Sequence, residues 1–165
     1  MATVVYKVGD DISTDVIYPG RFMATVLPSE TPLLAFADDA AFNAKLKAKQ
    51  ILPDSVIVGG QNFGCGSSRE QAASCLKGHE LTIVAKSFAR IFLQNAINLG
   101  LRVVSCPRIE AKEGDELQIT DAEVVNHTSG ERFLVTPLPK SRQAIIDAGG
   151  LIAYTRKRVL EMVAP

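Results

Sequence analysis

The stretch SVIVGGQNFGCGSSREQA, residues 55–72, contains the signals of a strand, a turn and a helix start in direct succession. An apolar run at 55–60 reads as a buried strand and ends at two glycines. The segment NFGCGSSREQA at 62–72 is too polar for a core. Its glycines suit a helix interior poorly, because each costs about 1 kcal/mol there relative to alanine. The stretch predicts a backbone turn that a ligand can approach, followed by a helix to about Leu76.

Similar strand and helix signals lie on both sides of this stretch. TVVYKV at 3–8, LTIVA at 81–85 and LRVVS at 101–105 are typical of strands. SFARIFLQNAINLG at 87–100 has the apolar period of an amphipathic helix, closed by its final glycine. These strand–helix–strand units predict an α/β fold in which helices pack on a mixed, at least partly parallel sheet.

The other segments give weaker signals, and five further expectations follow from them. They are a polar turn at 10–20 with a Pro-Gly stop, a proline-broken loop with short helical turns at 21–36, an aspartate-capped helix at 38–50, β-hairpin material at 115–139, and two helices around Gly149 and Gly150.

Length and composition limit the class of protein. A chain of 165 residues predicts one domain, spanning residues 1–165. Lys plus Arg and Asp plus Glu both number 18, so the formal net charge is zero and nothing favours nucleic acid or an acidic membrane surface as partner. No apolar run approaches the ~18 residues of a membrane span, and the N-terminus lacks the layout of a signal peptide.

The three cysteines, Cys65, Cys75 and Cys106, include no closely spaced pair. An odd number without paired spacing argues against a disulfide framework and indicates a reducing, cytoplasmic compartment. Ligands of iron–sulfur clusters usually include a tight C-x-x-C pair. We therefore expect no cluster or other metal to be bound by this chain alone.

The turn at 62–72 has two interpretations. Ser67 and Glu70 fit the capping box S-x-x-E, in which the serine accepts from the backbone N–H of residue 70. A cap does not require Gly64 and Gly66, however, and those glycines let a ligand come close to the backbone. Bare N–H groups at a helix start attract anions, and Arg69 adds a fork that matches a carboxylate. The lysine of a P-loop is absent, which disfavours a nucleotide and a phosphate-binding transferase.

Ser67 could also act as a base. A serine alkoxide becomes accessible where backbone N–H groups and a cation stabilise it, so Ser67 could abstract a proton. A nucleophile elbow G-x-S-x-G is absent. The two histidines, His79 and His127, lie in no obvious triad context, so a hydrolase is weakly supported.

Three segments together resemble a known family. NFGCGSSREQA at 62–72, IVAKSFARIFLQNAINLGL at 83–101 and STDVIYPGRF at 13–22 occur in the order found in the small subunits of 3-isopropylmalate dehydratases. These subunits are swivelling domains of the aconitase type. The resemblance extends over nearly the whole chain, and the combination is far more specific than any single motif.

The resemblance implies a β/β/α swivelling domain that closes over a larger subunit. That partner would carry a [4Fe–4S] cluster through its own cysteines, with no cluster ligand from this chain. The implied reaction is the dehydration and rehydration of a small hydroxy-carboxylate in leucine biosynthesis.

The resemblance also assigns roles to residues of the turn. By the family pattern Ser67 is the base that takes the proton α to a carboxylate. The implied substrate-binding residues are Arg69 for a carboxylate, Ser68 and the neighbouring backbone for the oxyanion, Gly66 for close approach, and Asp15 for organising the site. Arg90 matches a family position that we expect to be structural.

Substrate choice in this family depends partly on the loop after the Pro-Gly turn. Small subunits often have a Y-L-R-T type sequence there, whereas this chain has Phe22, Met23, Ala24 and Thr25. An arginine would favour an extra carboxylate, so its absence points to an apolar substituent such as isopropyl or methyl. Phe22 and Met23 could equally be plain core residues.

Several alternatives remain open at this level. They are a 2,3-dimethylmalate dehydratase subunit, a homoaconitase-type subunit, and, in another class, a non-catalytic carboxylate-binding module. A binding module should keep its function without the Ser67 hydroxyl, whereas a lyase should lose turnover.

Overall fold

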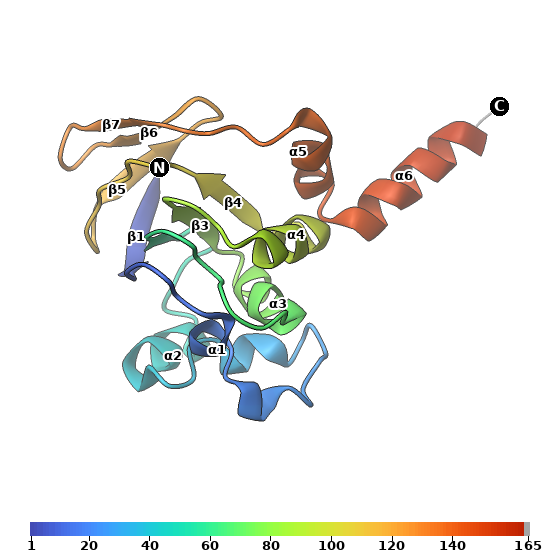
Figure 1. Ribbon diagram of the computed structural model, residues 1–165, viewed down its shortest axis with the longest axis horizontal. Helices are drawn as coiled ribbons and strands as arrows, with labels where there is room; N and C mark the ends of the chain where they lie inside the picture. Colours follow the sequence, from blue (N-terminus) through green and yellow to red (C-terminus); the bar gives the residue numbers. More distant parts are fainter. Residues whose placement is uncertain (164–165) are drawn as a thin grey trace.

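The computed structural model describes residues 1–163, which form a seven-stranded mixed sheet with helices packed along it (Figure 1). The strand order is β4-β3-β2-β1-β5-β6-β7. The strands are β1 Ala2–Lys7, β2 Val56–Gly59, β3 Thr82–Ala85, β4 Arg102–Ser105, β5 Glu116–Ile119, β6 Glu123–Asn126 and β7 Arg132–Leu134. The helices are α1 Thr14–Ile17, α2 Ala40–Lys47, α3 Glu70–Gly78, α4 Arg90–Leu99, α5 Lys140–Asp147 and α6 Leu151–Val163, with short 3-10 turns η1 Gly20–Phe22 and η2 Thr31–Leu34.

Four strands, β1 to β4, are parallel, which confirms the predicted strand–helix–strand arrangement. Successive side chains of a strand point to opposite faces, so these strands are apolar on both faces. Ile57 and Ile83 face the core under the helices, and Val56 and Val84 face a second core beside the hairpins. Burial on both faces explains why the sequence shows continuous apolar runs rather than alternation.

The segment after β4 forms the antiparallel half of the sheet, as the hairpin prediction for 115–139 required. β5 pairs with β1, and β6 and β7 follow as consecutive neighbours. The turn between β6 and β7 is held by the Asn126 side chain, whose Oδ1 accepts from the backbone N–H groups of Thr128 at 3.0 Å and Ser129 at 3.1 Å. An asparagine that bonds its own following backbone is typical of a tight turn.

One expected turn contains a helix instead. Residues 14–17 form α1, which begins after Ser13, whose Oγ accepts from the N–H of Val16 at 3.3 Å. Ile17 and Tyr18, at its end, are fully buried in the helix-side core. The stretch looks polar in sequence because it contains three aspartates, all of which are exposed. Burial of Ile17 and Tyr18 anchors the single helical turn to the core.

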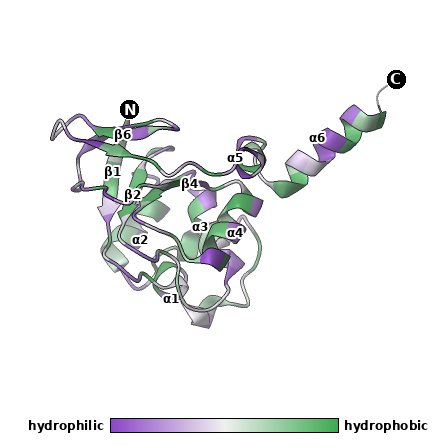
Figure 2. Cartoon of the chain, turned by 45° about the horizontal axis from the view of Figure 1, so that its top comes forward, coloured by the Kyte–Doolittle hydropathy of each residue, from purple (hydrophilic) through white to green (hydrophobic). Residues whose placement is uncertain are grey.

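The last helix, α6, projects away from the rest of the molecule (Figure 1). It mixes hydrophobic and hydrophilic residues along its length (Figure 2), and none of its side chains in the described residues is buried. No helix within residues 1–163 combines the length and apolar character needed to cross a lipid bilayer.

Ending the chain after Gly150 is therefore expected to change the melting temperature by no more than about 3 °C, because none of the removed side chains in the described residues is buried. Differential scanning calorimetry on the isolated chain measures this. A loss of ten degrees or more would contradict the separate position of α6. Truncation after Pro139, which also removes α5 and its buried Ile146, is the matched control and should destabilise clearly.

Candidate functional site

The site lies where two loops meet at one edge of the sheet. β1 and β2 are parallel neighbours, so the loops that follow them leave from the same edge. Backbone hydrogen bonds join them residue by residue. They run from Asp11 N to Gln61 O at 2.8 Å, from Gly64 N to Ile12 O at 2.7 Å, and from Thr14 N to Cys65 O at 2.8 Å. The segment 11–15 is thereby placed against the glycine-rich turn, which brings together two of the three motifs singled out in the sequence.

Gly64 is required by this close packing. Its φ is +81°, in the left-handed region, and a Cβ atom there would lie 2.2 Å from Cγ of Phe92. Phe92 is buried and stacks against neighbouring rings, so it has no space to withdraw. Gly66 also has a positive φ, of +87°, but a Cβ there would come no nearer than 3.7 Å to any neighbour. Gly64 is therefore needed because there is no room for a side chain beside Phe92, whereas Gly66 is needed for its left-handed φ alone.

The predicted capping box is wrong. Helix α3 begins only at Glu70, and the residue before it, Arg69, makes no side-chain cap bond. The carbonyl oxygen of Ser67 accepts from the buried hydroxyl of Thr14 at 2.8 Å. This bond holds the serine segment against α1, and Arg69 after it has an extended backbone, so the helix starts later than the motif suggests.

The serine turn presents unpartnered backbone donors. Among the residues that the structure describes, the N–H groups from Gly66 to Arg69 have no hydrogen-bond acceptor. The side chains of Ser67 and Ser68, which belong to this run, are exposed. Successive free N–H groups before a helix attract an anion or an oxyanion. Such donors would stabilise a neighbouring serine alkoxide, the form of the side chain that can take a proton from a bound molecule.

Arg69 and Asp15 form an ion pair at the edge of this turn. The guanidinium is only 12% exposed, and its Nη1 also donates to the carbonyl of Tyr18 at 3.3 Å. Its Nε is buried without a partner. Asp15 accepts additionally from the N–H of Gly20 at 2.7 Å. The bond from Arg69, followed by that from Gly20, holds the pKa of the Asp15 carboxyl below its usual range. Asp15 thus fixes Arg69 while tying it to the loop after the Pro-Gly turn.

The loop 22–25 lies beside the serine turn. Phe22 is half-buried against the helix-side core, under the Arg21 guanidinium, whose carbon lies 4.6 Å from the ring centroid. Met23 is 51% exposed and Ala24 is exposed, so core packing describes Phe22 alone. Asp15 accepts from Gly20 just before this loop, and Gln71, two residues after Arg69, donates to the carbonyl of Met23 within it. The loop expected to choose the substrate therefore adjoins the Arg69–Asp15 pair at the end of the turn that carries Gly66, Ser67 and Ser68.

Three residues that contact this site were not singled out from the sequence. Thr14 holds the carbonyl of Ser67, Tyr18 donates to two carbonyls of the loop, and Gln71 donates to a third. All three stand within quoted segments, Thr14 and Tyr18 in STDVIYPGRF and Gln71 in NFGCGSSREQA. Arg90 begins α4 and is exposed, and within residues 1–163 it makes no ion pair.

The cysteines do not form a common site. Cys75 and Cys106 are buried, and burial raises the pKa of both thiols, that of Cys106 to about 11. Cys65 is half-buried, with its Sγ 3.3 Å from the carbonyl of Asp11. In the described part of the chain no three His, Cys, Asp or Glu side chains are grouped so that they could hold a metal ion. The donor set here does not fit a cluster.

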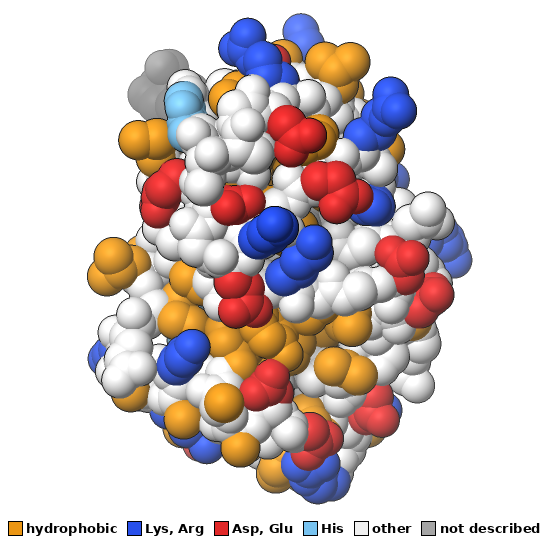
Figure 3. All heavy atoms as spheres, turned by 90° about the vertical axis from the view of Figure 1, so that its left-hand side faces the viewer, with side chains coloured by type: hydrophobic (Ala, Val, Ile, Leu, Met, Phe, Trp, Pro, Cys, Tyr) orange, Lys and Arg blue, Asp and Glu red, His pale blue; other side chains and the backbone are white. Residues whose placement is uncertain are grey.

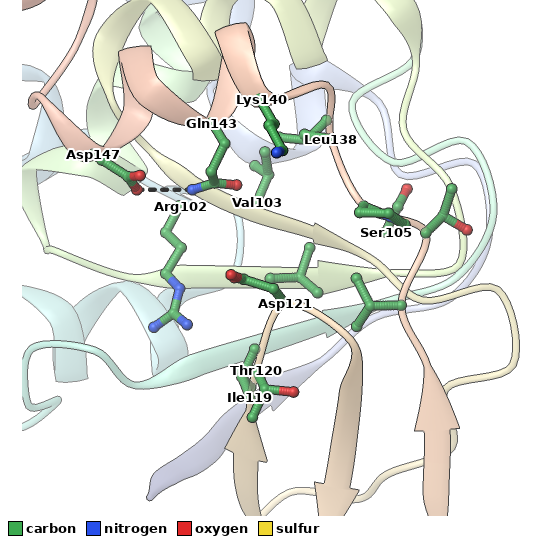
Figure 4. A pocket seen from close by; sticks show the side chains of 14 residues that line it. Arg102, Val103, Ser105, Ile119, Thr120, Asp121, Leu138, Lys140, Gln143 and Asp147 are labelled. Atoms are coloured by element: carbon green, nitrogen blue, oxygen red, sulfur yellow. Dashed lines mark hydrogen bonds between the residues drawn. The ribbon is translucent and has the colours of Figure 1, made fainter.

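A separate groove of about 380 Å³ lies between β4, α5 and the segments 119–121 and 135–138 (Figure 4). Charged side chains of both signs line it, and Gln143 donates to Asp147 at 2.8 Å. It shares no residue with the serine turn. The surface in Figure 3 likewise mixes acidic and basic side chains without a field of one sign. Neither feature adds chemistry to the site.

Comparison with known proteins gives one family and a consistent set of relatives. The family model described as the aconitase C-terminal domain matches residues 12–108. A relative from Methanosarcina acetivorans named 3-isopropylmalate dehydratase small subunit is 42% identical over 94% of this chain and 96% of its own length. The 2,3-dimethylmalate dehydratase small subunit of Eubacterium barkeri is 42% identical over 91% and 93%.

A solved structure confirms the similarity in three dimensions. The crystal structure of 3-isopropylmalate dehydratase from Methanocaldococcus jannaschii superposes with a TM-score of 0.87 at 38% identity, covering 97% of this chain and 95% of that one. The predicted α/β fold of the aconitase C-terminal type is thereby confirmed.

Proposed function

We propose that this chain, which belongs to the aconitase C-terminal domain family, is the small subunit of a hydro-lyase that acts on 3-isopropylmalate. One observation supports this most directly. An exposed serine belongs to a run of residues with free backbone N–H groups, next in the chain to an arginine that a carboxylate holds in place. This chain would then supply half of an active site, and a larger subunit the other half.

In this proposal Ser67 takes the proton from the carbon α to a substrate carboxylate. The C–H electron pair forms the double bond as the hydroxyl leaves the neighbouring carbon, and the proton ends on Ser67 Oγ. Free N–H groups from Gly66 to Arg69 lower the energy of the serine alkoxide before the transfer, and Ser68 adds a hydroxyl donor. Rehydration with the opposite regiochemistry returns the proton from Ser67, which gives an isomerisation.

Arg69 would bind a substrate carboxylate through the guanidinium donors that Asp15 leaves free. Asp15 is a positioning residue in this scheme, since it fixes the guanidinium and does not touch substrate. A [4Fe–4S] cluster, which we place on the partner subunit, would supply a Lewis acid for the leaving hydroxyl. The three dispersed cysteines of this chain agree with that division, because they offer no ligand set.

The apolar side chains around the loop favour an alkyl substituent on the substrate. Met23, Val26 and Leu27 are all more than half exposed and are free to line a pocket completed by the partner. A pocket of this kind separates substrates that differ by one methylene by only ~1–3 kcal/mol. The similarity to the relative from Eubacterium barkeri therefore makes 2,3-dimethylmalate the second candidate substrate. A homoaconitase-type substrate is disfavoured, because the loop lacks the arginine expected for its extra carboxylate.

The test is a turnover assay with a series of 2- and 3-alkylmalates, in which anaerobically reconstituted large subunit is added to this chain. We expect activity only in the mixture, with 3-isopropylmalate as the preferred substrate. Preference for 2,3-dimethylmalate would retain the lyase and change the substrate. Carboxylate binding by this chain alone, without turnover of any alkylmalate in the mixture, would identify a binding module and refute the proposal.

Asp15→Asn is expected to raise KM about tenfold while kcat changes less, because Arg69 loses the charge that orients it. The native pair has a simple pH dependence. Since the pKa of Asp15 lies below its usual range, the pair is intact above that lowered value and is lost only as the pH falls through it. Titration of Asp15 should therefore not change the KM of the native complex between pH 6 and 8.

Glu110→Gln is the matched control for Asp15→Asn. Glu110 forms an ion pair with Lys86 and is 61% exposed, close to the 63% of Asp15, but it lies outside the site. Steady-state kinetics on both variants separate a local effect from a loss of surface charge. Equal kinetics for the two variants would contradict the positioning role of Asp15.

A further inference from the structure

We infer that Tyr18 and Gln71 are positioning residues that fix the loop 22–25 and thereby determine how sharply the complex discriminates between alkylmalates. This inference rests on the proposed function for its kinetic part. Its structural part concerns only the free chain. Neither residue is expected to touch substrate, and both act through the backbone of the loop.

Tyr18 holds the loop from below. Its side chain is fully buried, and its hydroxyl donates a shared hydrogen bond to the carbonyl oxygens of Thr25 at 3.1 Å and Phe22 at 3.3 Å. The Phe22 carbonyl also accepts from the N–H of Thr25 at 2.9 Å. Within residues 1–163, the Thr25 carbonyl accepts no other hydrogen bond. The buried hydroxyl of Tyr18 thus bonds the first and the last residue of the turn 22–25. It holds these two carbonyl groups close together and close to the core.

Gln71 holds the same loop from the side. Its Nε2 donates to the carbonyl oxygen of Met23 at 3.2 Å, which accepts no other hydrogen bond in the described part of the chain. Gln71 stands in the first turn of α3, two residues after Arg69. The loop is thus bonded to the helix start that carries the carboxylate-binding arginine, so the distance between the loop and the serine turn is fixed.

The hydrogen bonds from Tyr18 and Gln71 matter because residues 26–31, which follow the loop, make few other hydrogen bonds. Beyond Thr25, the backbone bonds up to Thr31 are local ones, from the N–H groups of Glu30 and Thr31 to the carbonyl of Leu27. The side chains of Met23, Val26 and Leu27 are exposed and pack on no core of the chain. Without the hydroxyl of Tyr18 and the amide of Gln71, only the packing of Phe22 and local turns would hold the exposed apolar side chains that we place beside the alkyl group.

The variants are Tyr18→Phe and Gln71→Met, each of which removes the donor and keeps the shape of the side chain. Tyr6→Phe is the matched control. It removes a tyrosine hydroxyl that donates to Asp39 at 2.6 Å and not to a carbonyl of the loop. Because Tyr18 is buried, its variant could unfold the chain, and the half-buried Gln71 then provides the second test.

The first measurement is amide hydrogen exchange of residues 22–30 in the free chain. We expect about tenfold faster exchange in Tyr18→Phe and Gln71→Met, and unchanged exchange in Tyr6→Phe. The second is the ratio of kcat/KM for 3-isopropylmalate to that for 2,3-dimethylmalate in the reconstituted complex. In Tyr18→Phe and Gln71→Met we expect this ratio to move toward one by about fivefold, chiefly through a change in KM. The kcat of each variant on the preferred substrate should stay within about threefold of the wild-type value.

The outcomes separate the two proposals. Unchanged exchange in both variants, or faster exchange with an unchanged substrate ratio, would overturn the inference and leave the proposed function standing. Absence of turnover by the wild-type mixture with every alkylmalate would instead refute the proposed function, and with it the kinetic part of this inference.

Discussion

Ser67→Ala is expected to lower kcat of the reconstituted complex by about a thousandfold and to leave KM within about threefold. In the proposed mechanism the base acts in the transition state, whereas Arg69 and the free N–H groups would hold the carboxylates of the bound substrate. Removing Oγ therefore removes an interaction made only during proton transfer. Stability should hardly change, because the side chain is exposed and its structural bond is made by the carbonyl oxygen.

Ser68→Ala is the matched control for Ser67→Ala. It deletes the same hydroxyl one residue later, from a side chain that is also exposed. With only a supporting donor lost, we expect about a tenfold decrease in kcat. Stopped-flow or coupled assays with 3-isopropylmalate measure both variants. Equal losses would assign the base to neither serine, and full activity of Ser67→Ala would refute the catalytic role of Ser67.

Much of the fold was predictable because its signals are local. The parallel strands are short apolar runs, and α4 ends at Gly100 as its pattern indicates. The antiparallel half follows from alternation and from the turn at Asn126. Each of these features depends on residues a few positions apart, so the physical rule that produces it can be applied to the sequence alone.

The internal bonding of the site was less predictable, because it depends on contacts between distant residues. Ser67 looked like a cap from its own neighbours, but its carbonyl is taken by Thr14, which lies 53 residues earlier. Arg69 was predicted from the sequence to bind a carboxylate of the substrate, yet its ion pair with Asp15 forms only when two loops meet at the sheet edge. The role of Tyr18 depends on burial, which the polar appearance of its segment concealed.

Gly64→Ala is expected to destabilise the chain by about 2–5 kcal/mol, which corresponds to a fall in melting temperature of roughly 5–15 °C. Two costs add here. A left-handed φ costs a residue with a Cβ about 1–2 kcal/mol, and forcing a methyl into a packed core costs about 1–3 kcal/mol. The methyl would lie 2.2 Å from Cγ of Phe92, so either the ring or the serine turn must shift.

Gly66→Ala isolates the first of these costs, because its φ is equally positive while its nearest neighbour lies 3.7 Å from the added methyl. We expect a loss of about 1–2 kcal/mol, a few degrees in melting temperature. Thermal and urea unfolding of both variants measure the difference, which is the packing cost against Phe92. If the two variants unfolded alike, strain in φ alone would explain both glycines. Phe92, packed between Phe63 and Phe88, would then have to yield to the methyl, and the turn that carries Ser67 would be softer than its contacts indicate.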